Sequence, residues 1–207
     1  MSPRRRCGEC TLCCKLLPMK KDKDREVRST ITAMVAGGML KPEDAFRMTP
    51  DFDKPAGERC PHQRHSKGCA IYDRRPFGCR MWSCRWLVND DTNALPRPDR
   101  SHYVIDIAPD FITDADTGTV IPVIQVWVDP AFPDAWHDDR LRDYIARRGK
   151  EGYATLIRYS GREAQAIFPP TMTGGGWVIK PRMIARDQEH TPEEKARALG
   201  TYKLTLG

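Results

Sequence analysis

Eight cysteines within the first 84 residues are the side chains of this 207-residue chain that are best suited to chemistry. They are Cys7, Cys10, Cys13, Cys14, Cys60, Cys69, Cys79 and Cys84. The first four occupy only eight positions, and so short a segment buries too little for all of them to be core side chains. Cysteines two residues apart on a tight turn bring their sulfur atoms toward one point, the geometry that a soft metal ion or an iron–sulfur cluster needs.

The cellular compartment decides between metal and disulfide bonds. The basic start of the chain, residues 1–6, runs directly into the first cysteine without the apolar segment of a secretory signal. Nowhere do 18 apolar residues follow one another. We therefore predict a cytoplasmic protein with no membrane partner. Because cytoplasmic cysteines stay reduced, eight of them in one region favour metal binding over disulfide bonds.

The second group of cysteines carries two histidines and several residues that shape the backbone. His62 and His65 are candidate nitrogen ligands, although histidines in a polar loop are more often solvated or hydrogen-bonded. The Arg75-Pro76 dipeptide fixes an extended or turn geometry, and Gly78 removes a side chain just before Cys79. We expect these residues to bring the backbone close to a bound centre.

Two tryptophans, Trp82 and Trp86, flank Cys84. Indole rings beside a metal centre exclude water and so tune its reduction potential or its lability. Ordinary core packing explains the pair at least as well.

The order of these cysteines resembles that of the CxxCxxCC cysteine-cluster proteins of YkgJ type. The resemblance covers residues 7–86 and rests on the motifs Cys7-x2-Cys10-x2-Cys13-Cys14, Cys60-Pro61, Cys69-x-Ile71-Tyr72-Asp73-x-Arg75-Pro76-x2-Cys79-Arg80 and Cys84. It implies a zinc- or iron-chelating domain of a mostly bacterial family, and it defines no reaction. A similar cysteine motif in the flagellin lysine methylase implies a redox or group-transfer role by analogy, but we find no nucleotide or S-adenosylmethionine fingerprint.

The spacing favours an iron–sulfur cluster over zinc as the cofactor. Three cysteines at x2 spacing followed by a remote Cys-Pro are typical of ferredoxins, whereas zinc sites more often consist of two distant Cys-x2-Cys pairs. Side chains of adjacent residues diverge, so Cys13 and Cys14 indicate two centres or one bridged polynuclear centre. On the ferredoxin analogy, one cluster is held by Cys7, Cys10, Cys13 and Cys60, and a second site by Cys14, Cys69, Cys79 and Cys84.

The charge of the chain is uneven. Residues 1–100 carry 21 Lys and Arg against 13 Asp and Glu, whereas residues 101–207 carry 13 against 15. A basic half is typical of binding to nucleic acid or another acidic partner. Metal-bound cysteines are thiolates, however, and a four-thiolate site carries a charge of about −2. Part of the surplus is therefore expected to be counter-charge, and the candidates are Lys15, Arg59, Arg80 and Arg85.

The elements that position the cysteines follow from hydrophobic periodicity. Val27, Ile31, Met34 and Val35 form one helical stripe that ends at Gly37-Gly38, and we expect this helix to pack on the metal loop. A second, short helix is expected from residues 41–44, followed by an irregular loop over residues 48–58. Turn-forming residues between positions 89 and 98 indicate a boundary. We predict a cysteine-cluster metal-binding module over residues 1–88 and an α+β part over residues 89–207, packed as one globular unit.

The second part is predicted to be a small antiparallel sheet with helices. Residues 103–107 and 120–128 are expected to form an antiparallel pair joined by a turn-rich stretch, and residues 153–159 and 164–168 two more strands around Ser160-Gly161-Arg162. Between the pairs, Asp134 is expected to cap a helix that ends at Gly149. Its inward-facing side chains are Leu141, Tyr144 and Ile145. The predicted class is α+β, with the cysteine-rich module packed on the sheet.

Three further motifs favour structure over function. The Gly174-Gly175-Gly176 run lacks the lysine and serine of a phosphate-binding loop and is expected to be a flexible loop. The His137-Asp138-Asp139 run lies in the first turn of a predicted helix, where acidic residues are favourable. Residues 191–194 have the pattern of a capping box. No nucleophile, base and acid can be assembled from the sequence, so whether the protein is an enzyme stays undecided.

The sequence thus predicts a metal-binding protein that coordinates an iron–sulfur cluster or zinc through eight cysteines, with a redox or cluster-dependent role. Its partner would be an unidentified small molecule or protein. One alternative is a zinc-stabilised module without catalysis that binds nucleic acid or an acidic protein. Another is a metal-handling protein whose thiols store or deliver the ion.

Overall fold

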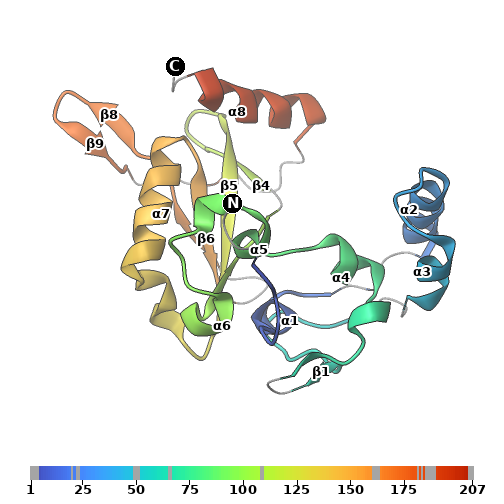
Figure 1. Cartoon of the computed structure of the whole chain (residues 1–207). Helices are drawn as coiled ribbons and strands as arrows, with labels where there is room; N and C mark the ends of the chain where they lie inside the picture. The colour runs from blue at the N-terminus through green and yellow to red at the C-terminus, as the bar shows by residue number, and fades with distance from the viewer. Residues whose placement is uncertain are drawn as a thin grey trace.

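The computed structural model describes residues 5–19, 21, 24–48, 52–64, 67–107, 110–159, 164–180, 182, 184 and 190–204 (Figure 1). The first half of the chain contains short helices and one small hairpin. Its elements are α1 (Leu12–Leu16), α2 (Asp24–Ala36), α3 (Pro42–Arg47), β1 (Gln63–Arg64), β2 (Gly68–Cys69), η1 (Tyr72–Arg74), α4 (Phe77–Met81), α5 (Arg85–Val88), η2 (Asp90–Thr92) and α6 (Pro98–Ser101).

The second half contains the main sheet and two longer helices. Its elements are β3 (Tyr103–Ile105), β4 (Asp110–Thr113), β5 (Val120–Val128), η3 (Pro133–His137), α7 (Asp139–Lys150), β6 (Ala154–Arg158), β7 (Ala164–Ile167), β8 (Thr171–Thr173), β9 (Gly176–Val178) and α8 (Pro192–Leu204). The predicted α+β class is confirmed. No helix among the described residues is long and apolar enough to cross a membrane.

The main sheet has the order β3-β5-β6-β7, with β4 also paired to β5. The antiparallel pairing of β3 with β5 is confirmed, and β6 and β7 are the two further predicted strands. Ser160-Gly161-Arg162 lies outside the described residues. The sheet is mixed, however, because β5 and β6 are parallel and α7 makes the crossover between them. The turn-rich stretch expected after β3 contains an additional strand, β4.

Strand β5 is the centre of the sheet because its side chains are apolar on both faces. All its residues except Val120 and Gln125 are buried. It contains a proline, Pro122, which has no N–H to donate to a neighbouring strand. The ladder with β6 starts one residue later, at Val123, so Pro122 pairs only with β4 and leaves no hydrogen bond unmade on the other side.

The two faces of the sheet pack against different layers. On one face, Ile105, Val126 and Val128 contact Leu141, Tyr144 and Ile145, the three residues predicted to face inward from α7. On the other face, the cross-strand pair Val104 and Trp127 packs on the cysteine-rich half. There it meets Leu12 and Leu16, the two buried apolar side chains of α1. The sheet therefore serves as the platform of the predicted cysteine-rich module.

An ion pair fastens α1 to the end of β5. The Lys15 ammonium lies 2.6 Å from the Asp129 carboxylate, which is only 6% exposed. Asp129 also accepts the Ala131 N–H. Replacing Asp129 with asparagine leaves the lysine without its counter-charge, and we expect the free energy of unfolding to fall by about 1–3 kcal/mol. Urea unfolding measures this loss, and an unchanged midpoint would show that the pair adds nothing to the packing of α1 on the sheet.

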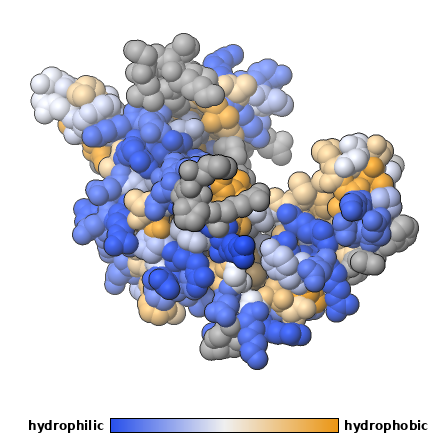
Figure 2. Space-filling model, viewed as in Figure 1, coloured by the Kyte–Doolittle hydropathy of each residue, from blue (hydrophilic) through white to orange (hydrophobic). Residues whose placement is uncertain are grey.

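The α2 helix does not pack on the metal loop as expected. Its start and its end at Gly37 agree with the prediction, but its main contacts are with α3, the second predicted helix. Together they form a helical hairpin set apart from the sheet (Figure 1), and Figure 2 shows hydrophobic residues on its surface. Ile31, Met34 and Val35 are only half-buried, and Met39 beyond the helix is 71% exposed. The side chain of Val27 lies outside the described residues.

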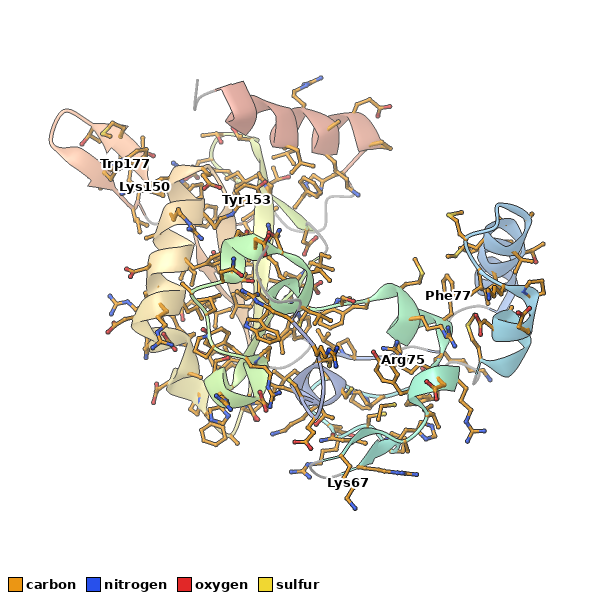
Figure 3. The ribbon with its side chains drawn as sticks, in the orientation of Figure 1. Lys67, Arg75, Phe77, Lys150, Tyr153 and Trp177 are labelled. Atoms are coloured by element: carbon orange, nitrogen blue, oxygen red, sulfur yellow. The ribbon has the colours of Figure 1, made fainter. Side chains whose placement is uncertain are left out.

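Some of the smaller predictions for the second half of the chain are confirmed, and others are corrected. The cap of α7 is Asp138, whose carboxylate accepts the Arg140 N–H, because Asp134 lies in the separate turn η3. The helix continues past Gly149 to Lys150. The capping box is confirmed by the reciprocal bonds of Thr191 and Glu194. Gly174 and Gly175 form the turn of the β8–β9 hairpin, and Gly176 begins β9. This hairpin lies with Trp177 far from the cysteine-rich half (Figure 3).

Candidate metal centre

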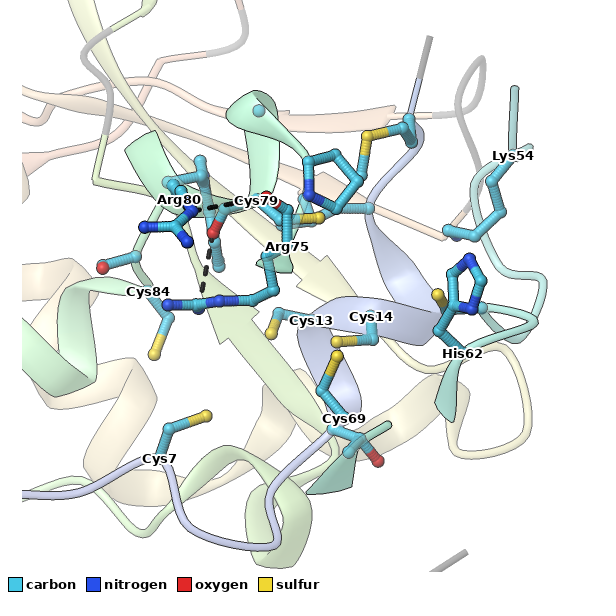
Figure 4. A pocket seen from close by; sticks show the side chains of 18 of the residues that line it. Cys7, Cys13, Cys14, Lys54, His62, Cys69, Arg75, Cys79, Arg80 and Cys84 are labelled. Atoms are coloured by element: carbon cyan, nitrogen blue, oxygen red, sulfur yellow. Dashed lines mark hydrogen bonds between the residues drawn. The ribbon is translucent and has the colours of Figure 1, made fainter. Parts of the chain in front are cut away.

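All eight cysteines line a single cavity of about 580 Å³ between the cysteine-rich half and the sheet. Figure 4 shows six of them, Cys7, Cys13, Cys14, Cys69, Cys79 and Cys84, around this space. Every cysteine is a free thiol. The fold thus brings cysteines up to 77 positions apart in the sequence to the same cavity. The residues predicted as ligands therefore face one another.

The first four cysteines are placed by a turn and one helical turn. The Cys10 N–H donates to the Cys7 carbonyl at 2.9 Å, which closes the turn between them. Gly8 in this turn has a φ of +53°, in the left-handed region that a glycine adopts without strain. Cys13 and Cys14 follow inside α1, whose buried leucines fix it on the sheet.

The β1–β2 hairpin brings the middle cysteines to the same cavity. Cys69 ends β2, and Cys60 begins the turn into β1, in which the Gln63 N–H donates to the Cys60 carbonyl. The Gln63 side chain reaches across to Thr11 at 2.6 Å, so the hairpin is tied to the start of α1. Gly68 has a φ of +78°, and a Cβ atom there would lie 3.2 Å from the Gly8 carbonyl oxygen. Only glycine therefore lets the two loops approach this closely.

The last two cysteines lie on or next to two short helices, and contacts from Arg5 hold the second of these helices in place. Cys79 is in α4, and Cys84 directly precedes α5. The Arg5 guanidinium lies over the Trp86 ring, 4.9 Å from its centroid, and donates to the Trp86 carbonyl and to Thr92. The segment that carries the first cysteines is thereby held beside α5.

Burial raises the pKa of most of these thiols. It raises the pKa of Cys7, Cys10, Cys60 and Cys84, and it raises the pKa of Cys79 to about 12. A thiolate is the form that binds metal, so loading such a site releases protons. The cavity is therefore a low-dielectric space that favours thiolates only when a cation compensates them.

Cys13 and Cys14 are the exception, because they interact directly. A hydrogen bond between the two thiols raises the pKa of Cys13 and lowers that of Cys14. Nearby cations, Lys54 and Arg75, lower the pKa of Cys14 further. These two residues lie where the two groups of cysteines meet.

Packing divides the cysteines into four that share one cluster and four that lie outside it. The first set is Cys7, Cys10, Cys13 and Cys84, which share one packed cluster. The second set is Cys14, Cys60, Cys69 and Cys79. After burial, the strongest influence on the pKa of Cys7 is the Cys84 thiol, whereas Cys79 is influenced by the three other members of its own set. The partition based on ferredoxins, which places Cys60 with Cys7, Cys10 and Cys13, stays a prediction.

The donor set suits a thiolate-bound centre by its chemistry, because eight soft ligands face one space. Within the described part of the chain, no three Cys, His, Asp or Glu side chains already converge as ligands of a single ion. The thiols instead line the walls of the space.

Not all of the histidines and tryptophans considered in the sequence analysis line the cavity. His62 lines the cavity and packs edge-on against Phe52, with ring centroids 5.3 Å apart, whereas His65 is outside the described residues. Trp82 lines the cavity and donates its indole N–H to Asp106. Trp86 donates to the Leu95 carbonyl and packs in the core. Trp127, which the sequence analysis overlooked, adds a second indole wall.

Of the four basic residues predicted to balance the thiolate charge, only some lie near the cysteine sulfur atoms. Lys15 and Arg85 already have carboxylate partners, Asp129 and Asp91. Arg59 is exposed and is not among the residues that line the cavity, whereas Arg80 is. Two further cations, Lys54 and Arg75, also line it. Lys54 had no sequence signal, and Arg75 was considered only for its backbone.

A cavity lined by eight soft thiol donors is typical of a thiolate metal-binding module. Residues 6–97 match the CxxCxxCC family model, described as "Putative zinc- or iron-chelating domain". This match confirms the resemblance derived from the cysteine motifs, and it indicates chelation of zinc or iron as the function of this part of the chain. No curated protein and no solved structure matched the chain.

Proposed function

We propose that the protein is an electron-transfer or redox protein that holds iron–sulfur clusters in two adjacent four-cysteine centres. The observation that carries the proposal is that eight free thiols line one cavity, four of them within one packed cluster. The first centre is formed by Cys7, Cys10, Cys13 and Cys84, and the second by Cys14, Cys60, Cys69 and Cys79. Four thiolates are the usual ligand set of an iron–sulfur cluster.

The junction of the two sets supports a redox role over a purely structural one. Cys13 and Cys14 are neighbours in α1 and are hydrogen-bonded to each other, so bound centres would lie side by side. An iron–sulfur cluster supplies a reversible one-electron couple, and adjacent clusters allow an electron to pass between them. Closed structural zinc sites need no such proximity.

The surroundings of the thiols supply the conditions that a cluster requires. The indole rings of Trp82 and Trp127 form an apolar wall that limits water, which sets the dielectric around a centre. Lys54, Arg75 and Arg80 line the same space and balance thiolate charge. We propose no reaction on a substrate.

The proposal is tested by anaerobic purification followed by iron, zinc and acid-labile sulfide analysis and an absorption spectrum. We expect brown protein with iron and sulfide and a broad absorbance near about 400 nm, the range of thiolate-bound clusters. Colourless protein that contains zinc without sulfide would contradict the redox role. In that case the zinc-stabilised binding module would be the better explanation, and its nucleic-acid affinity should fall steeply with salt.

A further inference from the structure

We propose that Arg75 is a positioning residue shared by both cysteine sets, whose guanidinium donates hydrogen bonds to the thiolate sulfurs and stabilises the negative charge of the loaded and reduced centres. This inference rests on the function proposed above. It assigns a role to a side chain that lies within the cavity but is not a ligand.

The backbone around Arg75 holds its side chain over the cavity. Arg75 follows η1 and precedes the buried Pro76, with an extended φ and ψ of −55° and 147°. Arg80 fixes this segment, because its guanidinium donates to the carbonyls of Arg75 and Asp73. In Figure 4 the Arg75 side chain extends between Cys79 on one side and Cys7 and Cys13 on the other.

The guanidinium is itself held in one orientation. Its central carbon lies 3.9 Å from the centroid of the Tyr72 ring, a cation–π contact. Its Nε–H donates to the Tyr72 carbonyl at 3.0 Å, and one Nη1–H donates to the Cys79 carbonyl at 3.5 Å. The second bond joins Arg75 to the backbone of a candidate ligand.

Arg75 retains free donors, whereas Lys54 has used all of its own. The three N–H groups of Lys54 donate to the carbonyls of Lys15, Pro55 and Glu58, so this lysine acts only through its charge. A guanidinium has five N–H groups, and Arg75 uses two of them on carbonyls. The remaining donors belong to a rigid fork that lies among thiols.

The charge of Arg75 has no carboxylate partner among the described residues, unlike that of Lys15, Arg85 or Arg97. It lines the cavity together with thiols of both sets, and in Figure 4 its side chain lies between Cys79 of the second set and Cys7 and Cys13 of the first. A half-buried cation without an acid beside it is stabilised by a nearby anion. Thiolates of the loaded centres supply that anion.

The consequence is a measurable change in reduction potential. One-electron reduction adds a negative charge to a centre, and a nearby cation and N–H···S hydrogen bonds favour that state. Removing Arg75 should therefore lower the potential. We expect the equilibrium constant for reduction to fall by about tenfold or more, which for a one-electron couple corresponds to a shift of about 59 mV or more.

The experiment is a spectroscopic redox titration of the anaerobic full-length protein with three matched variants. Arg75→Met removes the charge and the fork, and Arg75→Lys keeps the charge alone. Arg74→Met is the control, since it removes the same charge at the exposed neighbouring position. We expect a clear downward shift for Arg75→Met, a smaller one for Arg75→Lys and none for Arg74→Met.

The outcomes separate this inference from the proposed function. If Arg75→Met and the wild-type protein carry equal iron and sulfide and have the same potential, the role of Arg75 is overturned and the clusters stand. If the wild-type protein holds zinc, the variants are compared by chelator competition, and equal zinc affinity of Arg75→Met and Arg74→Met overturns the role. A wild-type protein that binds neither metal overturns both proposals.

Discussion

Replacing Cys84 with alanine is expected to remove the same half of the bound metal as replacing Cys7 with alanine. Both thiols belong to the first set and pack in the same cluster. A four-thiolate centre that loses one ligand is opened to water and loses its metal. The measurement is the metal content per chain after anaerobic purification, which should fall to about half in either variant.

Double variants make this prediction sharper. A Cys7→Ala and Cys84→Ala double variant should lose no more metal than either single one, because both residues serve one centre. A Cys7→Ala and Cys69→Ala double variant should lose all of it, since Cys69 belongs to the second set. Cys60→Ala is the control that distinguishes the two partitions. Should every single variant be empty of metal, one bridged polynuclear centre would replace the two-centre arrangement.

Removing the metal is expected to loosen the cysteine-rich half while the main sheet stays folded. The elements that carry the thiols are short, and they surround a cavity of about 580 Å³ instead of a packed core. Metal binding contributes about 10–16 kcal/mol to the folding of small zinc-finger peptides, so its loss affects the part of the chain with the least apolar packing. The sheet and α7 have a core of their own.

Hydrogen exchange followed by mass spectrometry checks this expectation. Amides of α1, β1, β2 and α4 should exchange faster in the chelated protein, whereas those of β5, β6 and α7 should be unchanged. The same comparison tests the predicted boundary after residue 88, which stays a prediction until then. Equal protection of all elements before and after chelation would show that the module folds without metal.

The sequence predicted which side chains gather but not how they are grouped. The clustering of thiols and the x2 spacing of the first three suffice to single out all eight cysteines. The grouping depends on where loops meet in space. Arg5 holds the first cysteines beside α5, and the β1–β2 hairpin places Cys60 away from them. Neither contact produces a periodic pattern in the sequence.

The fold was predictable to the extent that it is local. The strand β5 and the inward face of α7 follow from runs of apolar residues, and both are found where expected. The parallel pairing of β5 with β6 joins residues about 30 positions apart, and it arises only because α7 crosses the sheet between them. Strand β4 is four residues long and begins with an aspartate, so its pattern is that of a turn.

The bridge between Met19 and Lys54 has a practical consequence for work on this protein. Each residue donates its N–H to the other's carbonyl at 2.8 Å, so the chain that leaves the module at Met19 returns to it at the same point. The free-energy cost of closing such a stem grows only slowly with the length enclosed. The tip of the α2–α3 hairpin, around the exposed Met39, is therefore the position at which an affinity tag or a fluorescent reporter could be inserted while the thiol cavity stays intact.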